Sequence, residues 1–325
     1  MVAVDTDKYE MGAVNGSNET MLLSGHQGAV YSLVFDPTGS KLASASYDRC
    51  VFLWETEGDC TNYNVLKGHK NAVTQVRWCT DRSTLVTGSA DETCMTWDAN
   101  KGEMNRKFVA HTGIVNSVDS ATDAPDVFVS GSDDRSVLVW DSRNNAGPVH
   151  RFEERYQVTV VTVSADGQHV YSGGIDGVVR RYDVRVGSLE PDLQLVGCTN
   201  IVTGLSLSPD GGRLLVNAMD SALRSFDVRP FCARGEDHRL EQTFQGVHHG
   251  AEKTLLRAAW SADGERVTCG SADRNVHVWD SASAEEVHLL GGHKASVNDV
   301  VFHPAKQNVI ASGGSDKQIF LGPLS

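Results

Sequence analysis

The sequence predicts an all-β fold, a propeller of seven blades in which each blade is a four-stranded antiparallel sheet. Three observations lead to this prediction. An aspartate in a short polar turn recurs along the chain, an aromatic residue followed by an acid comes six residues later in most copies, and apolar and polar residues alternate with the period of a strand. The recurring aspartates are 42–44 residues apart, with one step of 53, and they are Asp48, Asp91, Asp134, Asp176, Asp220, Asp273 and Asp316.

The unit from residue 68 to residue 98 shows the pattern most clearly. Residues 73–78 alternate as in a strand, residues 85–87 begin a second strand, and residues 94–97 form a third. The turn formers at 80–83 and 90–93 separate them and are short enough for hairpin connections. The unit is therefore predicted to be an antiparallel meander, and the other units are copies of it.

Each complete unit contains four side chains that one chain of hydrogen bonds can join. A carboxylate accepts from an imidazole N–H, the second imidazole nitrogen accepts from a hydroxyl, and an indole N–H donates to that hydroxyl. Each bond contributes about 1 kcal/mol net, and removing one partner leaves buried groups unpaired at about 1–3 kcal/mol each. The first three units contain the full set, which is His26, Ser44, Asp48 and Trp54; His69, Thr87, Asp91 and Trp97; and His111, Ser130, Asp134 and Trp140.

A histidine beside a hydroxyl and a carboxylate can also indicate a nucleophilic triad. Because the same set recurs along the chain, we interpret it as structural and predict no catalytic residues. Phosphate-binding loops, nucleophile elbows and dinucleotide fingerprints do not occur in the sequence. The protein is therefore expected not to be an enzyme, and no cofactor or small-molecule substrate is expected.

The aromatic–acid pairs identify the repeat. They are Trp54-Glu55, Trp97-Asp98, Trp140-Asp141, Tyr182-Asp183, Phe226-Asp227 and Trp279-Asp280, and the seventh unit has Leu321-Gly322 at this place. A repeat of about 40–45 residues with Gly-His and Trp-Asp at its ends resembles the WD-repeat β-propeller family. The resemblance extends over nearly the whole chain.

Units four to seven lack part of the set. The fourth has residues 155–158 where Gly-His would stand, and the fifth has Cys198 there and Val216 in place of the hydroxyl. The sixth has Cys269 in place of serine, and the last ends with Leu321. Either neighbouring blades hold these units in place, or the units have diverged to shape a surface for a partner.

The chain is expected to consist of a disordered tail, residues 1–18, and one propeller domain, residues 19–325. The last repeat supplies only three strands after Ser296, whereas Met21 to Leu23 read as a strand that precedes the first repeat. In the family, an N-terminal strand completes the last blade. This closure would join the two ends of the chain and remove an exposed sheet edge.

Composition narrows the functional classes. The formal net charge of −13 argues against a nucleic-acid surface, so any contact with RNA is expected to be indirect. The seven cysteines are scattered and contain no Cys-x-x-Cys pair, which indicates reduced thiols. His248 and His249 are adjacent and would point to opposite sides of a strand, so we expect no metal site. No signal peptide or membrane span is expected.

A rigid disc without catalytic motifs is expected to bind proteins. In propellers of this family, the exposed residues of the narrower face are usually those just before the turn aspartates and those early in each first strand. Aromatic residues, Met and Arg dominate protein interfaces, so the candidate anchors here are Tyr31, Tyr47, Ile175, Met219 and Arg257. The long step after Asp227 adds about ten charged and turn-forming residues, which form either a tolerated loop or a second binding element.

Several phrases resemble a narrower family, the WD-repeat subunits of the U5 small nuclear ribonucleoprotein of the spliceosome. They occur in all parts of the ring, at residues 21–35, 58–69, 156–164, 172–177, 202–211, 217–231, 253–264 and 270–280. The resemblance implies a nuclear, non-catalytic scaffold for pre-mRNA splicing. It also implies partners, namely the large central splicing factor and its helicase and GTPase companions.

A rival interpretation is a substrate receptor of a cullin-type ubiquitin ligase. Residues 140–143 have the Trp-Asp-x-Arg form that such receptors use on their adaptor, with Arg143 as the candidate contact. Asp183 to Arg185 and Asp227 to Arg229 are similar. The motif also arises where Arg pairs within the propeller.

Overall fold

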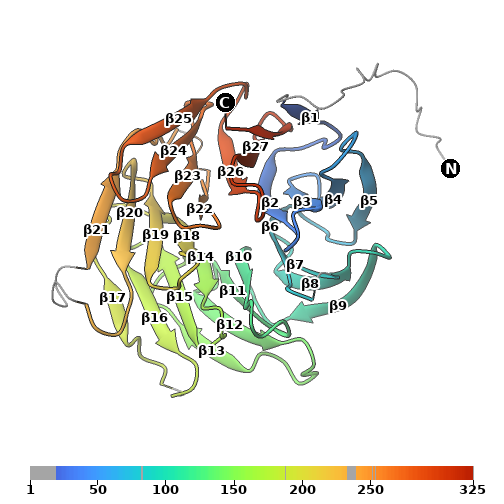
Figure 1. Ribbon diagram of the computed structural model, residues 1–325. Helices are drawn as coiled ribbons and strands as arrows, with labels where there is room; N and C mark the ends of the chain where they lie inside the picture. Colours follow the sequence, from blue (N-terminus) through green and yellow to red (C-terminus); the bar gives the residue numbers. More distant parts are fainter. Residues whose placement is uncertain are drawn as a thin grey trace.

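The computed structural model describes residues 20–81, 83–186, 188–232, 239–250, 252 and 254–324. In these residues the chain forms seven four-stranded antiparallel sheets arranged around a central channel (Figure 1). The prediction of an all-β propeller with seven blades is confirmed. The turn-rich insertion predicted after Asp227 lies partly outside the described residues, as does the predicted tail.

The first strand of each blade borders the channel. These seven inner strands are β2 (Val30–Phe35), β6 (Val73–Trp78), β10 (Val115–Ser120), β14 (Val158–Val163), β18 (Val202–Leu207), β22 (Ala258–Trp260) and β26 (Val297–Phe302). The second strands are β3 (Lys41–Ser46), β7 (Thr84–Ser89), β11 (Val127–Ser132), β15 (His169–Gly174), β19 (Arg213–Ala218), β23 (Arg266–Gly270) and β27 (Val309–Gly314).

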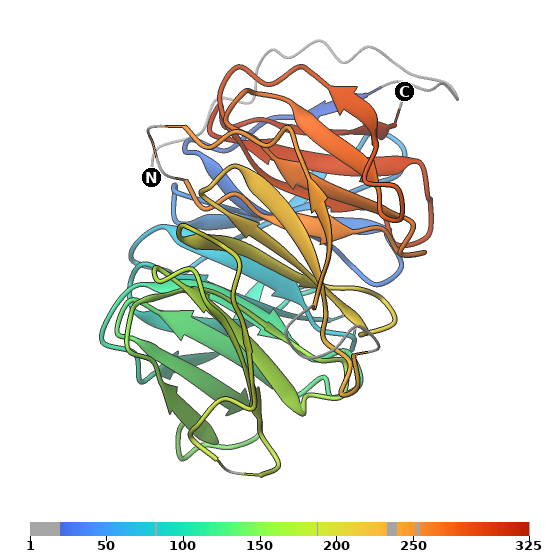
Figure 2. The same ribbon diagram turned by 90° about the vertical axis from the view of Figure 1, so that its left-hand side faces the viewer.

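The third strands are β4 (Cys50–Glu55), β8 (Thr93–Asp98), β12 (Ser136–Asp141), β16 (Val179–Asp183), β20 (Ala222–Asp227), β24 (Val276–Asp280) and β28 (Ile319–Pro323). The outer strands are β5 (Asn62–Lys67), β9 (Glu103–Val109), β13 (His150–Glu153), β17 (Leu193–Leu195), β21 (Leu240–Phe244), β25 (Glu286–Leu290) and β1 (Met21–Leu23). We number the blades 1 to 7 in the order of their inner strands. Figure 2 shows the twist of the sheets from the side.

Blade 7 contains both ends of the described chain. Strand β1 pairs antiparallel with β28, with Met21 opposite Leu321 and Leu23 opposite Ile319. Leu23 and Leu321 are buried and pack with Leu33 of blade 1. The predicted closure by an N-terminal strand is confirmed, and Leu321, which replaces the usual tryptophan, belongs to the apolar contact that seals the ring.

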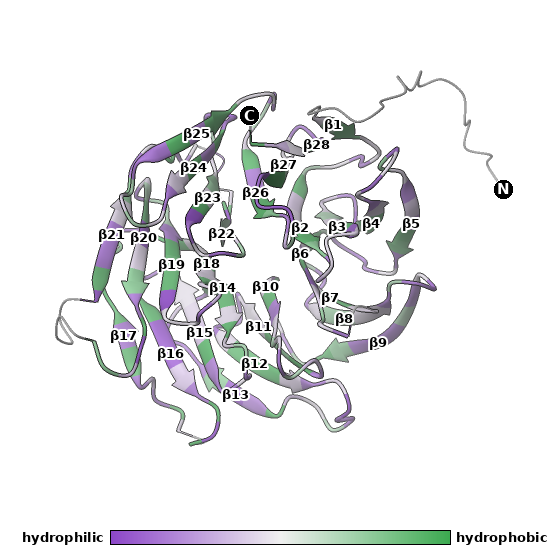
Figure 3. Cartoon of the chain, in the orientation of Figure 1, coloured by the Kyte–Doolittle hydropathy of each residue, from purple (hydrophilic) through white to green (hydrophobic). Residues whose placement is uncertain are grey.

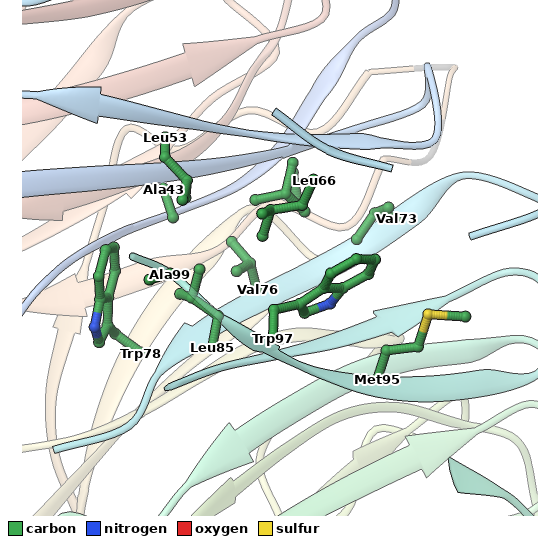
Figure 4. Packing of buried hydrophobic residues seen from close by; sticks show 12 residues of the cluster. Ala43, Leu53, Leu66, Val73, Val76, Trp78, Leu85, Met95, Trp97 and Ala99 are labelled. Carbon is green, nitrogen blue, oxygen red and sulfur yellow. The ribbon is translucent and has the colours of Figure 1, made fainter. Parts of the chain in front are cut away.

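The core lies between the blades. Seven clusters of buried side chains are formed by the described residues, and each joins two neighbouring sheets. In the cluster between blades 1 and 2, Leu53 and Leu66 of one sheet face Val76 and Trp97 of the next (Figure 4). Hydrophobic residues recur in every blade (Figure 3), because each sheet is covered on both faces by a neighbour.

Candidate protein-interaction face

The four predicted side chains of blade 2 form one hydrogen-bonded chain. His69 Nδ1 lies 3.0 Å from Asp91 Oδ2, and His69 Nε2 lies 2.7 Å from Thr87 Oγ1. Trp97 Nε1 donates to the same hydroxyl over 2.9 Å. Because a carboxylate only accepts, Nδ1 of His69 carries the proton and Nε2 accepts from Thr87. The glycine before the histidine is also explained: a Cβ on Gly68 would lie 2.9 Å from the Trp97 ring.

Blades 1 and 3 repeat this geometry. His26 lies 2.8 Å from both Asp48 and Ser44, and Trp54 donates to Ser44 over 2.9 Å. In blade 3, His111 lies 2.9 Å from Asp134 and 2.7 Å from Ser130, to which Trp140 donates over 2.8 Å.

The hydroxyls of these sets cannot meet a substrate in this structure. Ser44, Thr87 and Ser130 are each 0% exposed, and each is bonded to both an imidazole and an indole. A nucleophile needs an open approach to the carbon that it attacks. The geometry therefore fits a structural role for the three sets.

The turn aspartates of blades 2 and 3 are held in the ionised form. Burial alone would raise the pKa of Asp134, but hydrogen bonds from Ser136, the Thr112 amide and His111 outweigh it and lower this pKa to about 2. The pKa of Asp91 is also lowered, since hydrogen bonds from His69, Thr93 and the Lys70 amide exceed the effect of burial.

Blade 4, which lacks the histidine, has a different network in the same place. Glu154 accepts from Ser172 over 2.6 Å and from the Tyr182 hydroxyl over 2.7 Å. Arg180 pairs with Glu154 at 3.2 Å and with Asp176, the turn aspartate, at 2.6 Å. The alignment of residues 155–158 with Gly-His did not predict this replacement. Glu154 nevertheless precedes Asp176 by 22 residues, as His69 precedes Asp91.

Blades 5 and 6 each use a different side chain to contact the turn aspartate. In blade 5, Arg224 pairs with the turn aspartate Asp220 at 2.9 Å. In blade 6, His277 lies between Asp273 at 3.0 Å and Glu286 at 2.6 Å and stacks on Trp279. Blade 7 keeps its histidine, and His293 lies 3.0 Å from both Asp316 and Ser312. Each of these blades therefore has internal polar contacts of its own.

Residues early in the inner strands sit at β-bulges. The register shifts at Tyr31, Thr74, Asn116, Thr159, Thr203 and Asn298, one in each of six blades. A bulge redirects a side chain out of the regular ladder. Four of these side chains donate to a carbonyl of the next blade: Thr74 to Val115, Asn116 to Val158, Thr159 to Val202 and Asn298 to Val30.

Tyr31 and Arg257 depart from this use of small polar residues, and both border the channel mouth. Arg257 occupies the equivalent position in blade 6, directly before the inner strand β22, and its side chain extends across the channel. Its Nη2 donates to the carbonyls of Thr74 in blade 2, at 3.2 Å, and Asn116 in blade 3, at 3.1 Å. The expectation that Arg257 is exposed is wrong, since its exposure is 5%. Burial lowers the pKa of Arg257 to about 10, so it remains charged at neutral pH.

Three of the five candidate residues are brought together, and the other two lie apart from them. Tyr47 is 62% exposed and its ring meets that of Tyr31 edge to face at 6.4 Å. These two tyrosines and Arg257 line one hollow at the channel mouth. Ile175, which is 39% exposed, and the half-buried Met219 belong to blades 4 and 5 and do not line it.

Sequence reasoning missed half of the residues that line this hollow, among them Ile114, Leu255 and Glu252. Ile114 directly precedes an inner strand, a place for which no rule predicts exposure, and Leu255 and Glu252 follow the insertion. Burial, the neighbouring Tyr47 and Glu252 together raise the pKa of Tyr31. Tyr31 therefore remains a neutral hydroxyl.

Arg143 lies at the opposite end of β12 from the turn aspartate. It is exposed and donates to Asp141 through Nε at 2.9 Å and Nη2 at 2.7 Å. Arg185 with Asp183, and Arg229 with Asp227, show the same two-bond geometry. These motifs thus have an internal use, in which an arginine fixes the loop after the third strand.

Comparison with known proteins identifies the family. The family model described as WD domain, G-beta repeat matches residues 17–55, 60–98, 102–141, 147–183, 241–280 and 284–321, and leaves the first three strands of blade 5 unmatched. The U5 small nuclear ribonucleoprotein 40 kDa protein of Homo sapiens is 44% identical over 94% of this chain and 83% of its own length. The corresponding protein of Dictyostelium discoideum is 40% identical over 94% and 84%.

The chain belongs to this WD40-repeat family. The pre-mRNA-splicing factor cwf17 of Schizosaccharomyces pombe is also a relative, 41% identical over 93% of this chain and 86% of its own length. The family predicted from the short phrases is thereby confirmed. In the described part of the chain, no helix is long and apolar enough to cross a membrane, and no group of His, Cys, Asp and Glu side chains could hold a metal ion.

Proposed function

We propose that this WD40-repeat protein is a non-catalytic scaffold of the U5 small nuclear ribonucleoprotein in pre-mRNA splicing and that it acts in the nucleus. The observation that carries the proposal is identity of 40–44% over more than nine tenths of the chain with proteins named for that particle. Similarity of this extent includes blades 4 and 5, where the WD repeat itself is weakest.

The geometry supports placement of partners as the mechanism. The side chains of the hydrogen-bond sets bond to one another inside the blades. The two faces of the rigid disc therefore remain available for binding. An acidic protein is expected to contact basic protein surfaces within a ribonucleoprotein, and the phosphate backbone at most indirectly. The proposed partners are the large central splicing factor and its helicase and GTPase companions.

Co-purification tests this proposal. The protein is tagged in its own cell and recovered at moderate salt, and the recovered proteins and RNA are identified. We expect the large splicing factor, the helicase, the GTPase and the U5 RNA together. Recovery of a cullin adaptor without them, lost on Arg143→Ala, would replace the splicing role with that of a ligase receptor.

A further inference from the structure

Two hollows meet on the face that contains the turn aspartates. One, of about 350 Å³, lies at the channel mouth and has Arg257 in its lining, with Ile114 and Leu255 as apolar walls. The other, of about 680 Å³, lies between blades 1 and 2 and is lined by Arg49, Lys67 and Lys70. Tyr47 and Asn71 line both hollows. Together they form a groove that leads from the outer strand β5 to the channel, which we call the blade 1–2 groove.

The charge of this groove is opposite to that of the molecule. Its lining contains four cations and two carboxylates, whereas the whole chain has a formal net charge of −13. Arg49, Lys67 and Lys70 form no ion pair with any described residue and are exposed. Of the two carboxylates, Asp48 accepts hydrogen bonds from His26 and from the backbone amides of Gln27 and Cys50. Glu252 lines the hollow at the channel mouth and acts electrostatically on Tyr31.

The inner end of the groove has an incompletely satisfied cation. The Nε of Arg257 is buried and has no hydrogen-bond partner among the described residues. No carboxylate of the described residues lies within ion-pair distance of Arg257. Asp299, which influences Arg257 electrostatically, is itself buried and accepts from the Leu33 amide. A buried charge without an ion partner is costly, and an incoming anion would lower that cost.

We propose that the blade 1–2 groove binds an extended acidic segment of a protein partner. Acidic side chains of the segment pair with Arg49, Lys67 and Lys70, an apolar side chain packs on Tyr47 and Tyr31, and an acidic residue at the channel mouth faces Arg257. The apolar walls at Ile114 and Leu255 favour a peptide over a nucleic acid, since they can bury an apolar side chain of a peptide but offer no contact to a phosphate backbone. The proposal rests on the scaffold role and not on the splicing assignment.

Blade 7 supplies a matched control. Lys70 follows His69 as Lys294 follows His293, and both are exposed. Arg49 follows the turn aspartate with φ of 70°, and Lys317 does so with the same φ of 70°. Neither Lys294 nor Lys317 lines the groove. The double variants Arg49→Glu/Lys70→Glu and Lys294→Glu/Lys317→Glu therefore change the net charge equally, at equivalent places.

The test measures binding of purified full-length protein to fluorescein-labelled peptides by anisotropy. The probe has about eight residues, enough to span roughly 26 Å when extended, with glutamate alternating with leucine or alanine. A second peptide has glutamine in place of each glutamate, and a third probe is an oligouridine of similar length. Melting temperatures of all variants verify that they fold.

We expect the glutamate peptide to bind at least about tenfold more tightly than the glutamine peptide. The Arg49→Glu/Lys70→Glu variant should lose about tenfold in affinity, the blade 7 variant less than about twofold, and Tyr47→Ala about fivefold. Equal losses in the two double variants, equal binding of both peptides, no binding, or tighter binding of the oligouridine would each overturn the proposal. Because purified protein and synthetic probes are used, failure here leaves the splicing proposal standing, and failed co-purification leaves the groove standing.

Discussion

At the scale of single residues, the hydroxyl in each complete set is the member on which the others depend. Thr87 accepts from Trp97 and donates to His69, which in turn holds Asp91. A change at Thr87 therefore leaves two buried nitrogens without partners, whereas a change at Thr203, outside the sets, removes one long contact.

We expect Thr87→Val to lower the free energy of unfolding by about 2–4 kcal/mol, because His69 and Trp97 each lose a buried hydrogen bond. Thr203→Val is the control. Thr203 is equally buried, but its hydroxyl contacts only the Asn217 carbonyl of its own blade, at 3.4 Å, and a loss below about 1 kcal/mol is expected. Denaturant unfolding measures both, and similar losses would contradict the structural role of the set.

Acid should destabilise the protein in two steps. Burial lowers the pKa of His111 and lowers that of His249 to about 4, so the unfolded state binds more protons below pH 6.5. The stability contributed by these neutral histidines is complete above pH 6.5 and is lost as the pH falls towards 4. Asp91 and Asp134, whose pKa values are lowered, in Asp134 to about 2, add a further loss below pH 4.

Melting temperature measured between pH 7.5 and 4 is expected to fall, and less steeply in His249→Gln. The Nε2 of His249 is buried without a partner among the described residues, so its protonation has no compensating contact. Identical slopes for the two proteins would show that His249 does not contribute to the pH dependence.

At the scale of the blade, the sheet requires a buried polar network but not one fixed set of residues. Blade 4 joins its second and third strands to the preceding loop through Glu154, Ser172 and Tyr182, and blade 6 uses His277 between two carboxylates. Divergence from the repeat therefore did not leave these sheets without internal bonds.

Glu154→Ala is expected to destabilise the protein by about 2–4 kcal/mol, because it leaves two hydroxyls without their acceptor and removes one of the two carboxylates that pair with Arg180. The adjacent Glu153→Ala is a control. Glu153 is exposed and pairs only with the exposed Arg151, so a change within about 0.5 kcal/mol is expected. Thermal unfolding distinguishes them, and equal stability of the two variants would exclude a network centred on Glu154.

At the scale of the whole molecule, the ring is closed by strand pairing and by side chains. Strand β1 completes blade 7, and Asn298 donates to the Val30 carbonyl while Asp299 accepts from the Leu33 amide. Closure thus joins blade 7 to blade 1 by the same kind of contact that joins the other neighbours.

Deleting residues 1–23 should lower the melting temperature far more than deleting residues 1–15. The longer deletion removes β1, exposes the edge of β28 and takes Leu23 from the core between blades 7 and 1. Differential scanning calorimetry of the two truncated proteins tests this. Equal melting temperatures would mean that β1 is dispensable for closure.

The sequence by itself determined the number of blades, the closing strand and the family. Those features depend on local periodicity and on residues such as His69 and Asp91 that recur at fixed spacing, so each copy supports the others. The hydrogen-bonding partners in blades 1 to 3 could be anticipated for the same reason, since they follow from the donor and acceptor inventory of four side chains.

Only the tertiary structure decided the burial and the contacts of residues whose partners come from distant blades. Arg257 was expected to be exposed, but the closed ring brings carbonyls of blades 2 and 3 within its reach across the channel. The meeting of Tyr31, Tyr47 and Ile114 at one hollow also depends on how the sheets are placed around the axis. Contacts between side chains far apart in sequence have no local periodicity, so they leave no pattern that a single sequence reveals.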